Sequence, residues 1–182
     1  MKLLLAVLAC MLLLTPAALA DSRALYDQAT AAYERQDYES VITLSSEALG
    51  EMDATDPLRG GILHIRASAE VMTQKYDAAI EDYSAALVAV RQVMVEKPDF
   101  KELELGILWE RGLAKTLNGH CSDAIIDYTE VLQQDANNAR ALADRGRCYA
   151  ELGQKDAARA DFDAAIRIEP GNEDALKWRS EL

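Results

Sequence analysis

The chain has 182 residues, a formal net charge of −12 and an apolar content of 50%. That length fits one ordinary domain with a continuous core, and the apolar content excludes a chain that is disordered throughout. The 31 acidic residues outnumber the 19 basic ones. This balance argues against nucleic acid and anionic lipid as partners, because both bind clustered Lys and Arg.

The first 20 residues have the composition of a cleaved export signal. Lys2 precedes an apolar run over residues 3–14, and residues 18–20 carry small side chains at the two positions that a signal peptidase requires. The run is about 12 residues long, short of the roughly 20 that cross a bilayer. We therefore predict cleavage after Ala20 and export, to the periplasm in a bacterium and out of the cell otherwise, with no stable membrane insertion afterwards. The alternative is a lipoprotein acylated at Cys10.

Beyond the leader, apolar stripes at helical spacing recur with a fixed period. Gly112 and Gly146 are 34 residues apart, and so are Tyr128 and Phe162. A 34-residue period with these residue types resembles the tetratricopeptide repeat. The last segment carries the family's motif as Leu142, Gly146, Tyr149, Ala158, Phe162 and Pro170.

The resemblance implies an all-α fold, a right-handed superhelical solenoid of antiparallel helix pairs that forms a single domain over residues 21–182. The approximate repeats are residues 22–55, 60–93, 105–138 and 139–172, of which the first is degenerate. Residues 173–182 follow as a terminal helix that caps the open end of the stack, with Leu176 expected to face the last repeat.

The residues themselves indicate the same arrangement. Gly153 lies between two helical stripes, where it can end one helix and turn the chain into the next. Ala67, Gly112 and Gly146 are small at positions where paired helices are expected to approach closely. Glycine costs a helix about 1 kcal/mol relative to alanine, so packing must offset that cost.

An insertion over residues 94–104 interrupts the period between the second and third repeats. Its surplus of eleven residues, counted from Ala67 to Gly112, is close to three helical turns. Asp99 followed by Glu102 resembles a capping box that opens a helix. We expect the two flanking helices to be lengthened into a ridge at the middle of the solenoid.

Motifs for catalysis are missing from the sequence. It has no glycine-rich phosphate loop, no Gly-x-Ser-x-Gly elbow and no His-Glu-x-x-His pair. The spacing of Cys and His does not match a metal site, so a zinc site is disfavoured and no cofactor is predicted. The residues that would form such a zinc site are His64, His120, Cys121 and Cys148. Scattered acidic residues, including Asp82, Asp127 and Asp161, are interpreted as solvated faces and helix starts, and the alternative is a cation site.

These observations favour a non-catalytic protein–protein interaction module of the cell envelope, which binds a segment of another protein or peptide in the concave groove of the solenoid. One alternative is a structural subunit that packs through its edge or its central ridge into a larger assembly. Another is a small-ligand binder, which needs convergent polar groups in a closed cavity. The oligomeric state is left open.

The resemblance also implies which side chains contact the partner, because the first helix of each repeat lines the groove in this family. Carried onto this sequence, the groove residues are Tyr26, Tyr33, His64, Ser68, Met72, Trp109, Leu113, Arg140 and Arg147. The Lys, Asn and Arg array that clamps a C-terminal carboxylate is missing. We expect apolar anchors in the middle of the groove and arginines that meet carboxylates of the partner, although Trp109 can instead belong to the core.

Export leaves two cysteines, Cys121 and Cys148, in a compartment that favours oxidation. Cys121 is expected near the start of a second helix, and Cys148 near the end of the following first helix. The two helices are expected to be antiparallel neighbours, so a disulfide between the third and fourth repeats is one prediction. The other is a pair of inert buried thiols.

Overall fold

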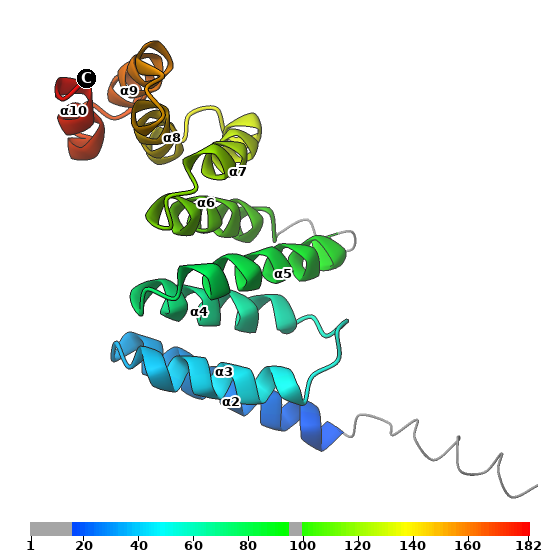
Figure 1. Cartoon of the computed structure of the whole chain (residues 1–182). Coiled ribbons are helices and arrows are strands. Elements are labelled where there is room, and N and C mark those ends of the chain that lie inside the picture. Colours follow the sequence, from blue (N-terminus) through cyan, green and yellow to red (C-terminus); the bar gives the residue numbers. More distant parts are fainter. Residues whose placement is uncertain (1–15, 95–99) are drawn as a thin grey trace, which may run out of the picture.

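The structure is a computed structural model that describes residues 16–94 and 100–182, and every regular element in them is a helix (Figure 1). The helices are α2 (Pro16–Glu34), α3 (Tyr38–Gly50), α4 (Arg59–Met72), α5 (Tyr76–Met94), α6 (Lys101–Leu117), α7 (Cys121–Gln134), α8 (Ala139–Glu151), α9 (Lys155–Ile168) and α10 (Glu173–Ser180). Residues 1–15 of the expected leader lie outside the described residues, and the backbone of residues 16–20 forms the start of α2.

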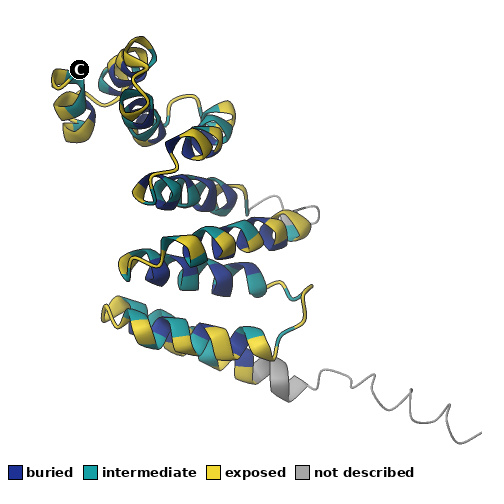
Figure 2. Ribbon diagram, viewed as in Figure 1, coloured by how far each residue is buried: buried dark blue, intermediate teal, exposed yellow. Residues whose placement is uncertain are grey.

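The helices stack as pairs, each made of a first and a second helix. The pairs are α2 with α3, α4 with α5, α6 with α7 and α8 with α9. The second helix of each pair packs on the first helix of the next, and α10 packs on α9 and α8. Buried residues face the layers between helices, while exposed ones cover the outside (Figure 2). The expected all-α solenoid is confirmed.

Each turn between the two helices of a pair closes on one residue in the left-handed conformation. Gln36 and Gln74 have φ values of 61° and 60°, and Gly119 and Gly153 have 78° and 73°. The amide of the following residue donates to a carbonyl five residues back, as from Gln154 to Tyr149 at 2.8 Å. This is the hydrogen bond of a helix that ends in a left-handed residue.

Buried aromatic rings lie so close to the first helices that only a small residue fits at the point of contact. A Cβ added at Gly112 would lie 2.7 Å from Cε1 of Tyr128, and one added at Gly146 would lie 2.7 Å from Cε1 of Phe162. Both rings are fully buried. The expected close approach of the paired helices is therefore present in the last two pairs.

A repeated ionic network joins consecutive pairs. Arg111 in α6 donates through Nε and Nη2 to Asp127 in α7, at 3.0 and 2.7 Å, and through Nη1 to Ser84 in α5 at 3.0 Å. Arg66 and Arg145 repeat the arrangement. Each guanidinium thus connects three helices.

The network corrects one interpretation of the sequence. Asp82, Asp127 and Asp161 are buried, with exposures of 9%, 1% and 7%, and are not solvated surface residues. Each aspartate lies 16 residues after its arginine, so the two side chains meet across the turn that joins the two helices of a pair. Burial is tolerated because both carboxylate oxygens accept charged hydrogen bonds.

The insertion lengthens the helices around it. Helix α5 has 19 residues and α6 has 17, compared with 14 in α4 and α7. The predicted capping residue Asp99 lies outside the described residues, and α6 begins at Lys101 after Phe100.

Helix α10 caps the last pair through a different face from the one expected. Leu176 is 46% exposed, whereas Ala175 is fully buried and the Trp178 ring lies 6.2 Å from that of Phe162. Residues 175 and 178 are three apart, so they share the helix face that points to α9. Asn172 fixes this rotation, since its side chain accepts a hydrogen bond from the Ala175 amide.

Candidate partner-binding groove

The first helices α2, α4, α6 and α8 contact one another in sequence, and α8 contacts α10. We call the surface that they form the first-helix face. All nine predicted groove residues lie on these four helices. Eight of them occupy three places along the face, and Met72 lies apart from these.

The middle group is held together by hydrogen bonds between helices. His64 Nε2 in α4 lies 2.5 Å from Glu110 Oε2 in α6. Ser68 Oγ donates to the His64 carbonyl and lies 3.2 Å from the Tyr83 hydroxyl. The Tyr33 ring lies 5.6 Å from that of Tyr38, and burial, followed by the neighbouring Tyr38 and Glu110, raises the pKa of Tyr33. Of these predicted residues, His64 contacts a carboxylate, that of Glu110, which sequence reasoning missed.

The second group borders an apolar hollow of about 330 Å³ between the first three pairs. Tyr26 lies there, with its hydroxyl 3.4 Å from the position of a Cβ added at Gly61. The hollow is lined by Tyr26, Pro57, Leu58, Gly61, Val90, Val93, Phe100 and Leu103. Met72 lies apart from it at the end of α4, 54% exposed.

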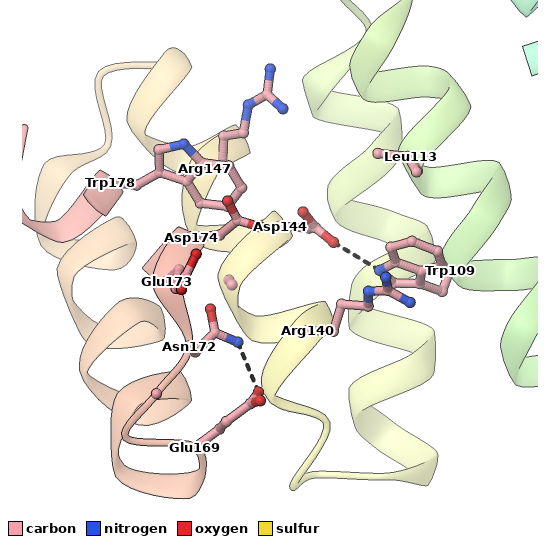
Figure 3. A pocket seen from close by; sticks show the side chains of 12 residues that line it. Trp109, Leu113, Arg140, Asp144, Arg147, Glu169, Asn172, Glu173, Asp174 and Trp178 are labelled. Carbon is pink, nitrogen blue, oxygen red and sulfur yellow. Dashed lines mark hydrogen bonds between the residues drawn. The ribbon is translucent and has the colours of Figure 1, made fainter. Parts of the chain in front are cut away.

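The third group borders a larger hollow of about 740 Å³ between α6, α8 and α10, which we call the tryptophan hollow (Figure 3). It contains the four predicted residues Trp109, Leu113, Arg140 and Arg147. The complete lining is Trp109, Leu113, Arg140, Ala143, Asp144, Arg147, Glu169, Gly171, Asn172, Glu173, Asp174 and Trp178.

Trp109 serves both as a wall of this hollow and as a partner of the core. Its ring is half-buried and packs against two buried clusters. Its Nε1 donates to Asp144 Oδ2 at 2.8 Å, and the Arg140 guanidinium lies 4.1 Å from the ring centroid. Trp109 therefore belongs both to the core and to the groove surface, because its ring packs on the buried clusters and also borders the hollow.

Asp144 and Trp178 complete the hollow and were missed from the sequence. Burial raises the pKa of Asp144 to about 6, against the hydrogen bond from Trp109 and the charges of Arg140 and Arg147. The Arg147 guanidinium lies 5.4 Å from the Trp178 centroid, and its Nε donates to Glu151 at 3.0 Å. The sequence signal for Trp178 was an aromatic residue in the capping helix, three residues after a small one.

The two cysteines share one buried cluster with Ala124 and Tyr128. Both thiols are free in the structure. Cys121 donates to Glu151 Oε2 at 3.0 Å, and Cys148 lies 3.2 Å from Thr116 Oγ1. Burial raises the pKa of both thiols. The disulfide remains a prediction, now with both partners placed between adjacent helices.

The described residues contain no group of three or more His, Cys, Asp or Glu side chains arranged to hold a metal ion. Of the residues considered for zinc, His64 is instead directed at Glu110. Within the same described part of the chain, no helix is both long enough and apolar enough to cross a bilayer.

Comparison with known proteins identifies the repeats. Residues 110–173 match the family model for the tetratricopeptide repeat. Tetratricopeptide repeat protein 34 of Mus musculus is 36% identical over 77 residues, which are 42% of this chain and 14% of that protein. The chain thus matches about a seventh of the length of this relative.

Solved structures share the fold at low sequence identity. MamA has a TM-score of 0.70 at 19% identity, covering 82% of this chain and 79% of that one. The first repeat domain of Spaghetti (RPAP3), bound to the HSP90 peptide SRMEEVD, has a TM-score of 0.59 at 18% identity, covering 71% and 94%. The family match and the paired helices identify residues 110–173 as tetratricopeptide repeats, and the solved structures share the fold of the described chain.

Proposed function

We propose that this protein is a non-catalytic interaction module of the cell envelope that holds a segment of a partner protein on its first-helix face. The family supports a role in protein interaction. The single observation that carries the rest is the tryptophan hollow, which opens on the same face as the predicted groove residues.

The chemistry of this hollow suits an interface. Trp109 and Trp178 offer large aromatic surfaces, and Leu113 adds an apolar contact between the third pair and the cap. Aromatic and Arg side chains are those that carry most of the binding energy in protein interfaces. A partner segment lying along the face would meet these side chains first and the His64–Glu110 pair next.

A photo-crosslinking amino acid in place of Leu113 tests the groove directly. We expect it to trap a partner in envelope extracts, while the same replacement at Ile126, 63% exposed on second helix α7, traps none. Trp109→Ala should abolish the crosslink, and Leu113→Glu should abolish pull-down of the partner, with helix content measured in parallel by circular dichroism. Equal trapping at Ile126 would refute binding on the first-helix face.

Export has a separate test. The support for it is the leader over residues 1–20, with Lys2, the apolar run and the small residues before Asp21. N-terminal sequencing of the protein from its native host should begin at Asp21. A protein that retains Met1 or Lys2 would contradict the proposal.

A second candidate function is a structural subunit that packs through one edge. Met72 and Leu117 end the first helices α4 and α6, and Leu152 follows α8, with exposures of 54%, 41% and 42%. These three apolar side chains occur near the turns of three consecutive pairs. Replacing Leu117 and Leu152, which are not among the predicted groove residues, with Gln should leave the groove crosslink intact and abolish co-purification of an assembly if this candidate holds.

A further inference from the structure

The charged groups of the tryptophan hollow are mostly acidic and unpaired. Its lining contains four carboxylates, from Asp144, Glu169, Glu173 and Asp174. Within the described part of the chain, none of them takes part in an ion pair with Lys or Arg. Arg147 is already paired with Glu151, which leaves Arg140 as the one unpaired cation among the described residues that line the hollow.

Asp144 lies between the two tryptophans, with its carboxylate directed toward Trp109 (Figure 3). Its Oδ2 accepts the indole hydrogen bond, and its Oδ1 accepts none from the side chains of the described residues. Burial disfavours its charged form. A cation placed beside this half-buried carboxylate offsets that cost, because opposite charges interact more strongly where water is partly excluded.

The aromatic walls are also suited to cations. The Arg140 guanidinium lies 4.1 Å from the Trp109 centroid, and that of Arg147 lies 5.4 Å from the Trp178 centroid. Both distances fall within the range of cation–π attraction. The two arginines are thereby held against the walls, and the space between them is bordered by carboxylates.

We propose that the tryptophan hollow receives a Lys or Arg side chain from a basic segment of the partner protein. The cation lies between Asp144 and the rim carboxylates of Glu173 and Asp174, and its aliphatic stem packs on Trp178 and Leu113. The net charge of −12 favours the approach of such a segment at a distance. This inference rests on the proposed function and replaces the expectation that the arginines of the groove meet an acidic partner.

Intrinsic fluorescence provides a readout specific to this hollow, because both tryptophans of the chain line it. The probes are three pools of short capped peptides with randomised flanking residues and a fixed central Arg, Gln or Glu. We expect the Arg pool to change the tryptophan emission at a concentration at least about tenfold lower than the Gln pool, with the Glu pool weaker still. Added salt should reduce the difference.

Paired charge-neutralising variants identify the site. Glu173→Gln with Asp174→Asn removes two carboxylates from the first turn of α10 at the rim. Asp123→Asn with Asp156→Asn makes the same change in charge at exposed first-turn positions of α7 and α9, away from the hollow. The rim variant should lose at least about tenfold in affinity for the Arg pool, and the control variant should retain its affinity.

Three outcomes overturn the inference: equal or reversed preference among the pools, equal loss in both variants, or no response to the Arg pool. If one of these occurs while the crosslink at Leu113 still traps a partner, the proposed function stands and only the basic chemistry of the partner is wrong. Loss of that crosslink with a retained Arg preference would instead contradict the proposed function.

Discussion

Two glycines in the same helix are expected to respond oppositely to replacement by alanine. Gly106 and Gly112 both lie inside α6. A Cβ added at Gly106 meets nothing within 4 Å, whereas one added at Gly112 would lie 2.7, 3.0 and 3.1 Å from three atoms of the Tyr128 ring. The ring is fully buried and cannot move aside without displacing its neighbours.

The magnitudes follow from two opposing effects. Alanine stabilises a helix interior by about 1 kcal/mol relative to glycine, and this gain is common to both sites. Overpacking a dense core costs about 1–3 kcal/mol, and this cost applies only at Gly112. We therefore expect Gly106→Ala to stabilise the protein by about 1 kcal/mol and Gly112→Ala to destabilise it by about 1 kcal/mol. The difference between the variants isolates the steric cost.

The assay is thermal and urea unfolding followed by circular dichroism. For a chain of this size the two variants should differ in melting temperature by about 4–8 °C. Adding Tyr128→Leu should remove most of the penalty at Gly112 and leave the gain at Gly106 unchanged, which tests the contact itself. If Gly112→Ala proves as stable as Gly106→Ala, the packing argument for the small residue is refuted.

Three further predictions concern other buried or strained groups. Burial, then the charge of Asp82, raises the pKa of Glu70 to about 7, and Glu70 Oε2 has no hydrogen-bond partner among the described residues. The raised pKa favours the protonated form in the fold, so its stability contribution is complete below the unfolded pKa of about 4.5 and is lost as the pH rises through about 7. Glu70→Gln should therefore raise the free energy of unfolding by about 2 kcal/mol above neutral pH and by little in acid, as urea titrations at both pH values will show. Gln74→Gly should stabilise the protein by about 0.5–1 kcal/mol, because φ of 60° is strained for glutamine; a lower melting temperature would contradict this. Refolding with a disulfide-forming oxidant such as diamide should couple Cys121 to Cys148 with loss of two hydrogens, detected by mass spectrometry, and raise stability by on the order of 3 kcal/mol; two thiols that still react with a thiol reagent in the unfolded chain would rule the bridge out.

The repeat architecture was readable in the sequence because it depends on local and periodic features. The 34-residue spacing of Gly112 and Gly146 predicted where paired helices approach closely, and the structure shows that the rings met there are Tyr128 and Phe162, which have the same spacing. The same pair of residue types recurs in the last two repeats, so one repeat provides the register for the next. The match of residues 110–173 to the tetratricopeptide repeat and the all-α solenoid agree with this pattern.

Other features depended on contacts between elements that no period encodes. Asp127 resembled a solvated residue until the fold placed it against Arg111, because burial of a carboxylate is decided by the helix packed over it. The sequence suggested that Leu176 faces the last repeat, but the capping helix α10 packs Ala175 and Trp178 on α9 instead. The turn before α10 determines how the helix is rotated about its own axis, and therefore which residues face α9.

The tryptophan hollow combines residues that the sequence predicted with residues that only tertiary packing placed there. The sequence placed Trp109, Leu113, Arg140 and Arg147 on first helices, because each repeat contributes one helix to that face. It did not reveal that Asp144 would lie between two tryptophans or that α10 would supply Trp178 and the acidic rim. Those groups come from three elements that meet only after the last repeat and its cap have packed, and their combined charge is a property of that meeting and not of any one segment.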